Sequence, residues 1–326
     1  MAFEISNSYF QEFQMVFHDM LHQHGSQLLP WVKSVPVTGE TQSLRFFNMG
    51  EATIGELGAS GLTEYSPVLY DRRVLRPVPI RQAILMNEFE MRRQGMPPVN
   101  ELAQRLSEGC GIALDTVILN GIGGTARTAS GGDIPLPTSQ IICYDTEIYG
   151  NVDNQGNART GLTAMKISYA IATLRHKFVE PEIICIASNK ALGQLQIDER
   201  AASSLYNRVQ TQSEGIMTPF AGVSAFVPSE RIPMPTKIHS TSGGAVVTAD
   251  SAAATEVANA DKKYEYAYVV ARNYITLGSS KEFELQSAQD PSRNMDLMFY
   301  CSGMYDCIRE QEEAVIAIEL DVTANN

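Results

Sequence analysis

The sequence lacks the residue spacings on which disulfide frameworks and zinc sites depend. Its five cysteines are scattered singly and form no CxxC pair: Cys110, Cys143, Cys185, Cys301 and Cys307. Small disulfide scaffolds carry many cysteines in a short chain, and zinc knuckles carry cysteines in closely spaced pairs. We therefore expect neither a disulfide framework nor a bound metal.

Long apolar runs are also missing. No stretch approaches the roughly 20 apolar residues of a membrane-spanning helix. The opening "MAFEISNSYF" has no basic region followed by an apolar core, as a secretion signal would have. These absences predict a soluble protein with no membrane partner, made in a reducing cytoplasm.

Recognisable catalytic and cofactor-binding motifs are absent from the sequence as well. The glycines of "GIGGTARTASGG" follow a predicted helix and include no lysine. A phosphate-binding loop needs a strand before it and a lysine within it, so a helix C-cap followed by a loop explains these glycines better. His18 and His22 share a helix face but have no identifiable third ligand, which favours a surface or interface role. We expect no enzyme activity and no cofactor.

Positive charge is scarce and unevenly placed. The chain has 25 basic and 37 acidic side chains and a net charge of −12, which argues against a general affinity for duplex DNA. No lysine occurs between Lys33 and Lys166. Residues 71–93 hold only three acids but six arginines: Arg72, Arg73, Arg76, Arg81, Arg92 and Arg93. Because arginine is the cation favoured at protein interfaces, this concentration indicates assembly with another chain.

The arginines lie in a segment that the sequence predicts to be extended. Residues 42–54 are typical of a strand, the glycine-rich "GELGASG" follows, and the arginine-rich segment returns as a second strand in which Pro77 and Pro79 exclude a helix. A hairpin with roughly 15 residues per arm would reach about 50 Å. The radius of gyration of a compact chain of this length is only about 20 Å. We therefore expect the hairpin to lie on another molecule.

The remaining elements predict a mixed α+β body. Amphipathic helices are expected over 7–24, 98–120 and 161–179, the last capped by Thr163. Buried strands are expected at "EIICIAS", over 264–278 and over 297–320. One face of the 98–120 helix carries an acidic row of Glu101, Glu108 and Asp115, which is either a solvated face or an interaction site.

This order of elements resembles the major capsid proteins of tailed bacteriophages, which have the Hong Kong 97-type fold. The resemblance covers most of the chain and extends to the branch known simply as phage capsid protein. It is carried by several stretches: "MAFEISNSYFQEFQ", "HGSQLLPWV", "YDRRVLRPVPIRQAILMNEFE", "GCGIALDTVILNGIGGTA", "GLTAMKISYAIATLRHKFVEPEIICIASNKAL" and "CSGMYDCIREQEEAVIAIEL".

The resemblance implies a division of the chain into four parts. Residues 1–41 would form an N-terminal arm and residues 42–80 an extended hairpin loop lying across the neighbouring subunit. Residues 81–160 would form a peripheral domain with 98–120 as its spine helix. Residues 161–326 would form an axial domain whose strands return to the peripheral domain.

The resemblance also suggests partners for the clustered charges. In a single chain, exposed arginines would contribute little each. We expect Arg72, Arg73, Arg76 and Arg81 to dock on acidic surface of the next subunit. The candidate acids are the row Glu101, Glu108 and Asp115 and the acidic tail Glu310, Glu312 and Glu313.

The implied function is structural. Such a protein self-assembles as pentamers and hexamers into an icosahedral shell that encloses double-stranded DNA without sequence-specific binding. It is assembled in the host cytoplasm and resides in the virion. The family's best-known member joins its subunits through a lysine of the extended loop. The loop of this chain has no lysine, so cohesion must be non-covalent or come from a decorating protein.

The resemblance further implies separate partner proteins. The arm leads within about 40 residues to the hairpin, which leaves no room for an internal scaffolding segment. We therefore expect a separate scaffolding protein and a portal. The alternatives are an encapsulin-like compartment, or an α/β enzyme with an unrecognised site.

Overall fold

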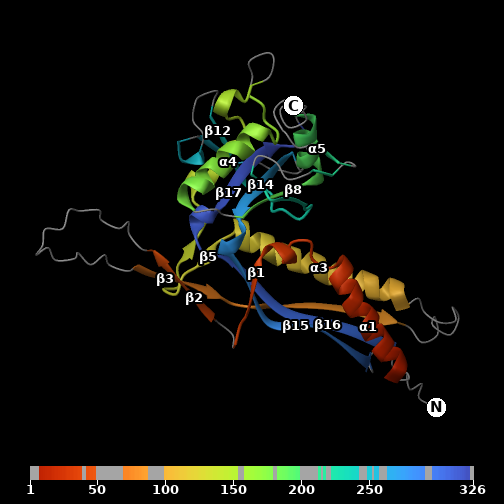
Figure 1. Cartoon of the computed structure of the whole chain (residues 1–326). Helices are drawn as coiled ribbons and strands as arrows, with labels where there is room; N and C mark the ends of the chain where they lie inside the picture. The colour runs from red at the N-terminus through yellow and green to blue at the C-terminus, as the bar shows by residue number, and fades with distance from the viewer. Residues whose placement is uncertain are drawn as a thin grey trace, which may run out of the picture.

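The structure is a computed structural model of the whole chain, shown in Figure 1. It describes residues 7–38, 42–48, 69–86, 99–152, 158–178, 182–198, 212–213, 216–217, 222–241, 248–251, 253–256, 263–290 and 296–323. The predicted glycine-rich hairpin tip "GELGASG", Arg92, Arg93 and the side chains of His22 and His24 lie outside the described residues.

A five-stranded sheet forms the centre of the upper body in Figure 1. Its strands run in the order β11 (Ala225–Pro228), β8 (Ile183–Ala187), β14 (Tyr264–Ala271), β17 (Val315–Asp321) and β7 (Ile141–Ile142). Every residue of β8 and β17 is buried, as expected for strands covered on both faces. One face packs against α4 (Ala164–Lys177) and α5 (Asn189–Ile197). The other face shares a buried cluster with the C-terminal half of α3 (Val99–Gly123).

A second, elongated sheet extends below this body, as Figure 1 shows. Its four strands run in the order β1 (Lys33–Pro36), β15 (Ile275–Asp290), β16 (Asp296–Arg309) and β4 (Val78–Met86). The helix α3 lies along this sheet, and α1 (Asn7–His24) packs beside α3. Phe13 of α1 is buried and stacks on Phe299 of β16, with ring centroids 4.3 Å apart. A single apolar core therefore joins α1, α3 and both sheets.

The hairpin projects sideways from the junction of the two sheets. It consists of β2 (Gln42–Asn48) and β3 (Leu69–Leu75), paired antiparallel from Gln42–Leu75 to Asn48–Leu69. Beside its base lies a smaller hairpin of β5 (Ala126–Arg127) and β6 (Asp133–Ile134), which contacts β3 through the bridge Arg73–Thr128. The segment "GIGGTARTASGG" thus contains the end of α3, the strand β5 and the loop that leads to β6, where the sequence predicted only a cap and a loop.

The arginine-rich segment belongs to two sheets, which corrects the prediction of one returning strand. The strand β3 ends at Leu75, and β4 begins at Val78 and pairs with β16 in the elongated sheet. Pro77 stands between them, and proline cannot donate a ladder hydrogen bond. The backbone N–H of Arg76 instead donates to the Asp306 carboxylate of β16 (2.6 Å). The chain therefore leaves the hairpin at Arg76.

Short strand pairs complete the described structure. The strands β12 (Lys237–Ser240) and β13 (Ala253–Glu256) pair antiparallel, as do β9 (Gln212–Ser213) and β10 (Ile216–Met217). Short 3-10 turns lie at Leu29–Trp31, Thr138–Gln140, Ile148–Gly150, Ala249–Ser251, Arg272–Tyr274 and Glu312–Ala314. The described part of the chain thus combines helices and sheets, as the predicted α+β class requires.

Candidate assembly surface

The structure separates the four arginines that the sequence grouped together. Arg72, Arg76 and Arg81 are exposed, whereas Arg73 retains only 3% of its accessible surface. Arg81 stands opposite Ser302 in the β4–β16 ladder, next to Gln82, which faces α3. Because side chains alternate along a strand, Arg81 points to the face of the elongated sheet away from α3. The prediction that these arginines are exposed in a single chain is therefore wrong for Arg73.

Arg73 is held by an acid of its own chain. Its Nη2 lies 2.6 Å from the Oε1 of Glu312, in the turn between β16 and β17. The other oxygen of Glu312 accepts a hydrogen bond from Nε of Arg309, which is completely buried. Arg309 also donates to the backbone carbonyls of Ile122 and Ile134 (3.2 and 2.7 Å). Glu312 therefore fastens the hairpin to the end of α3 and to β16.

The acidic row of α3 likewise includes both exposed and buried side chains. Glu101 is exposed, and Glu108 is half-buried and accepts a hydrogen bond from Gln104 one turn earlier (2.8 Å). Asp115 is buried, which excludes the solvated face that the sequence offered for it. Its carboxylate accepts from the Ser26 hydroxyl and from the backbone N–H groups of Gln27 (3.3 Å) and Leu28 (3.2 Å). Asp115 thus fixes the turn after α1 onto α3.

Electrostatics at Asp115 reflect this burial. Loss of solvation raises the pKa of the Asp115 carboxyl above its ordinary value, and the hydrogen bonds from Ser26, Leu28 and Gln27 oppose that rise. A carboxyl group held in this way is suited to fixing the turn onto α3.

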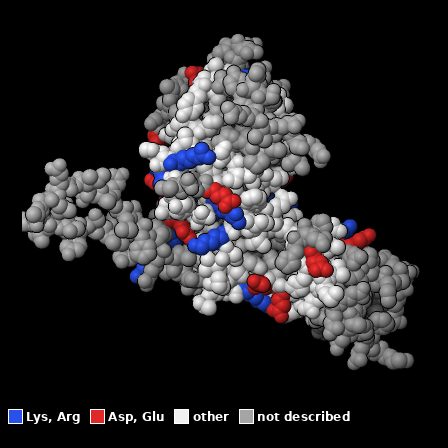
Figure 2. All heavy atoms as spheres, viewed as in Figure 1, with Lys and Arg blue, Asp and Glu red and all other residues white. Residues whose placement is uncertain are grey.

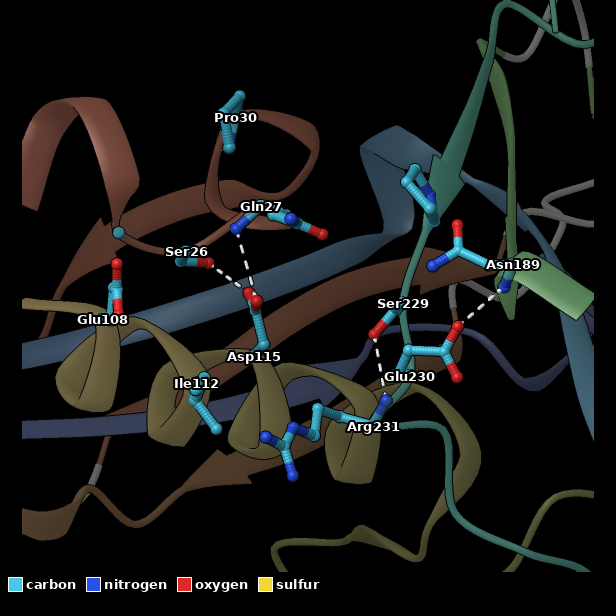
Figure 3. Close-up of a pocket in the computed structure, with 12 residues that line it drawn as sticks. Ser26, Gln27, Pro30, Glu108, Ile112, Asp115, Asn189, Ser229, Glu230 and Arg231 are labelled. Carbon is cyan, nitrogen blue, oxygen red and sulfur yellow. Dashed lines mark hydrogen bonds between the residues drawn. The ribbon is translucent and has the colours of Figure 1, made fainter. Parts of the chain in front are cut away.

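A cleft of about 640 Å³ opens beside this turn, as Figure 3 shows. One wall comes from α3 and the turn, with Glu108 and Ile112 on the helix. The opposite wall is formed by Asn189, at the start of α5, and by residues 228–231. The backbone N–H of Asn189 donates to the Glu230 carboxylate (2.9 Å), which orders that wall. The half-buried Glu108 therefore faces a recess large enough for a side chain of another molecule.

The acids near the C-terminal strands also have partners within the chain. Glu310 accepts from the Thr276 hydroxyl (2.5 Å) and lies 3.9 Å from Lys33 Nζ. Glu313 lies 2.6 Å from Lys177 Nζ, and about half of the Glu313 side chain remains exposed. On the face in Figure 2, the described basic and acidic residues lie interspersed, and they do not form a wide field of one sign.

The central role of Arg309 was not predicted from the sequence. Arg309 is a single arginine near the end of a long strand, and its four partners come from Glu312 and from three carbonyls of the 122–134 region. The nearest sequence signal is the glutamate three residues later, which is common in exposed turns.

The described residues contain neither a metal-binding cluster nor a membrane-spanning helix. Within those ranges, no cluster of three or more histidine, cysteine or acidic side chains could hold a metal ion. Among the helices described, none combines the length and apolar character needed to cross a membrane.

Solved structures of two phage capsids and of a virus-like particle share this fold. The match to the capsid of cyanophage Pam1 covers 91% of this chain and 92% of the Pam1 chain, with a TM-score of 0.60 and 11% sequence identity. The match to the capsid of cyanophage P-SCSP1u covers 91% of this chain and 87% of the P-SCSP1u chain, with a TM-score of 0.59 and 10% sequence identity. The match to a virus-like particle from Pyrococcus furiosus covers 95% of this chain and 98% of the particle's chain, with a TM-score of 0.55 and 10% sequence identity. At these identities the likeness concerns the fold, and it agrees with the predicted Hong Kong 97-type capsid fold.

The family of the chain follows from a separate comparison. No curated protein matches the sequence. A family model described as phage capsid protein matches residues 5–322, nearly the whole chain. The chain therefore belongs to the phage capsid protein family.

Proposed function

We propose that this chain is the major capsid protein of a tailed phage, and that its copies assemble as pentamers and hexamers into an icosahedral shell around double-stranded DNA. The family match over residues 5–322 supports this role. The observation that carries it is the hairpin β2/β3, which projects from the body while Glu312 anchors its base. A projecting element with a firmly held base is suited to reaching a neighbouring subunit. The encapsulin-like alternative is less well supported, because the matching family is one of phage capsid proteins.

The proposed parts keep the predicted bounds. Residues 1–41 serve as the N-terminal arm, 42–80 as the extended loop, 81–160 as the peripheral domain and 161–326 as the axial domain. The long strands β15 and β16 lie within 161–326 and pair with β4. This pairing supports the idea that axial-domain strands return to the peripheral domain.

The proposed contacts between subunits use the charges that stay exposed. Arg72 and Arg76 at the hairpin base and Arg81 on β4 dock on the neighbour's Glu101 and on Glu108 in the cleft. The exposed Glu313 and the half-buried Glu310 are the second acidic surface. Arg73 and Asp115 are assigned to the chain's own framework because both are buried, and Glu312 because it joins two buried arginines. Bidentate arginine–carboxylate pairs set orientation as well as affinity, so these contacts would fix the register between subunits.

The proposed partners follow from the charge of the chain and from the family to which it belongs. A net charge of −12 suits a wall that encloses DNA without binding it tightly. Assembly takes place in the host cytoplasm with a separate scaffolding protein and a portal. Cohesion of the shell is non-covalent or is completed by a decorating protein.

Charge reversal tests the contacts. We expect Arg72→Glu and Arg76→Glu each to reduce the yield of closed shells at least tenfold while the chain stays folded, because like charges would meet across the interface. Lys190→Glu, which reverses an exposed charge at the start of α5, is the matched control and should assemble normally. Shells are counted by sedimentation and negative-stain microscopy, and folding is checked by circular dichroism.

A rescue experiment identifies the partner. Adding Glu101→Lys and Glu108→Lys to Arg76→Glu should restore part of the shell yield, because the opposite charges are paired again. Normal shells from both single arginine variants would overturn the proposed contacts.

A further inference from the structure

Two thiols from separate elements meet at the contact between α3 and the elongated sheet. The sulfur of Cys110 on α3 lies 3.4 Å from the sulfur of Cys301 on β16. The two residues are 1% and 0% exposed, and 191 positions separate them in the sequence. Neither residue belongs to the proposed assembly contacts.

The packing of α3 brings these sulfurs together. Cys301 stands opposite Gln82 in the β4–β16 ladder, and the Cys110 sulfur also lies 3.8 Å from Oε1 of Gln82. A Cβ atom added at the neighbouring Gly109 would lie 2.2 Å from that same oxygen. The Gln82 side chain therefore packs directly against the helix at this turn.

We propose that Cys110 and Cys301 form a redox-sensitive clasp: a disulfide that closes between α3 and β16 when the protein meets a peroxide, and that a thiol reductant reopens. The two sulfurs must approach from contact distance to the roughly 2.05 Å of a disulfide bond. Their elements are already packed together, so the change falls mainly on two side chains.

In this reaction the two thiols give up two electrons and the peroxide accepts them, so no further group is needed. The hydrogen bond between the two thiols lowers the pKa of Cys110, against the opposing effect of burial. The Cys110 thiolate attacks one oxygen of hydrogen peroxide and breaks the O–O bond, giving a sulfenic acid and a hydroxide that takes up the released proton as water. Cys301 then attacks the Cys110 sulfur, and the sulfenic hydroxyl leaves with the Cys301 proton as a second water. Two thiols and one peroxide thus give one disulfide and two waters.

The clasp acts on the core that joins both sheets. A bond between these residues closes a loop spanning the 191-position separation, which restricts the unfolded chain strongly. It also prevents α3 from separating from β16. The consequence for a finished particle rests on the proposed function: shells assembled in a reducing compartment would become harder to open after meeting an oxidising medium.

The test uses the purified, unassembled wild-type chain treated with hydrogen peroxide. Thiols are counted after denaturation, and peptides are mapped by mass spectrometry. We expect two fewer thiols than the five of the reduced chain, one Cys110–Cys301 crosslinked peptide, and reversal by dithiothreitol. The oxidised chain should also show a higher Tm than the reduced chain.

Matched variants separate the clasp from general oxidation. In Cys110→Ala, peroxide should form no disulfide, and the Tm should not rise. Cys185→Ala removes another buried thiol and should behave like the wild type. Three results overturn the proposal: crosslinks to other cysteines, oxidation of Cys110 with Cys301 left reduced, or an unchanged thiol count at doses that fully oxidise an exposed thiol peptide. Because the reaction is measured in single chains, its failure leaves the assembly proposal untouched.

Discussion

At the scale of single residues, one carboxylate holds the base of the hairpin. Glu312 accepts from Arg73 and Arg309, and both of these arginines are almost completely buried. Removing the carboxylate would leave two guanidinium groups in a poorly hydrated place without their counter-charge, which is costly. The hairpin, the end of α3 and β16 are thereby linked through a single side chain.

This linkage gives a measurable difference between two adjacent glutamates. We expect Glu312→Gln to lower the free energy of unfolding by about 3–5 kcal/mol, as is usual when one partner of a buried ion pair is removed. Glu313→Gln should lower it by less than about 1 kcal/mol, because its pair with Lys177 is largely exposed. Urea unfolding of the unassembled chains measures both. Equal, small effects would mean that Glu312 does not hold the hairpin base.

Lys166 is a second buried charge, inside the upper body. It lies on α4, is completely buried, and its Nζ donates to the carbonyls of Tyr144 (2.7 Å) and Gly161 (2.9 Å). Burial lowers the pKa of Lys166 to about 7, against the nearby acids Asp145 and Glu319. In the unfolded chain the pKa of lysine is about 10.4. Above pH 7 the unfolded chain therefore binds more protons than the folded one.

The sign of the pH dependence follows from that difference. Stability should rise as the pH increases above about 7, by at most about 1.4 kcal/mol per pH unit, and should level off at lower pH, where both the folded and the unfolded chain hold the proton. We expect Lys166→Met to remove this slope between about pH 7 and 8.5, a window below the ordinary thiol pKa. Lys177→Met on the same helix should keep it, because Lys177 is partly exposed. The midpoints of urea unfolding, measured at several pH values in this window, test the prediction. If stability still rises with pH in Lys166→Met, Lys166 is not the group responsible.

Residue roles were predictable where they depend on near neighbours. The cap Thr163 was expected from local sequence, and its side chain accepts a hydrogen bond from a backbone N–H group at the start of α4. The burial of Asp115 and of Arg73 was not predicted, because their hydrogen-bond partners lie 88 and 239 positions away in the sequence. A charge pattern on one helix face or strand cannot reveal whether a distant turn covers it.

At the scale of elements, the close contact between the turn after α1 and α3 depends on small residues. A Cβ added at Gly111 would lie 2.5 Å from the carbonyl carbon of Gly25 and 2.7 Å from its oxygen. Backbone atoms cannot rotate away as a flexible side chain can. The position of the turn that carries Ser26 and Gln27 therefore requires glycine at 111.

Two glycine substitutions test this packing. We expect Gly111→Ala to lower the free energy of unfolding by about 1–3 kcal/mol, because the turn must shift. Gly193→Ala on α5 should raise it by about 0.5–1 kcal/mol, since no atom lies within 4 Å of its added Cβ and alanine favours a helix. Thermal and urea unfolding measure both. A stabilised Gly111→Ala would show that the turn does not pack as described.

Helices were predicted better than strand partners. The predicted helices over 7–24, 98–120 and 161–179 correspond to α1, α3 and α4, within a few residues at each end. Their periodicity and capping residues are local signals. The arginine-rich segment looked like one strand because its composition is uniform, yet its two halves pair with β2 and β16. Strand pairing depends on partners remote in sequence, so composition could not reveal the division at Arg76.

At the scale of the whole molecule, the described chain is a compact upper body joined to a long sheet, with a hairpin projecting from their junction. The shared core of α3, β15, β16 and the central sheet keeps these parts together. A projecting hairpin gains little from its own chain, since an isolated two-stranded ribbon is only marginally stable. Packing against another copy would supply the missing contacts.

The most direct test is the mass of the assembled protein. Light scattering of the purified chain, expressed with the scaffolding and portal proteins of its source, should reveal particles in the megadalton range that negative-stain microscopy shows as closed shells. Under the same conditions, Arg76→Glu should give markedly fewer of them. A wild-type chain that stays near the 35.8 kDa of a monomer with those partners present would contradict the capsid function.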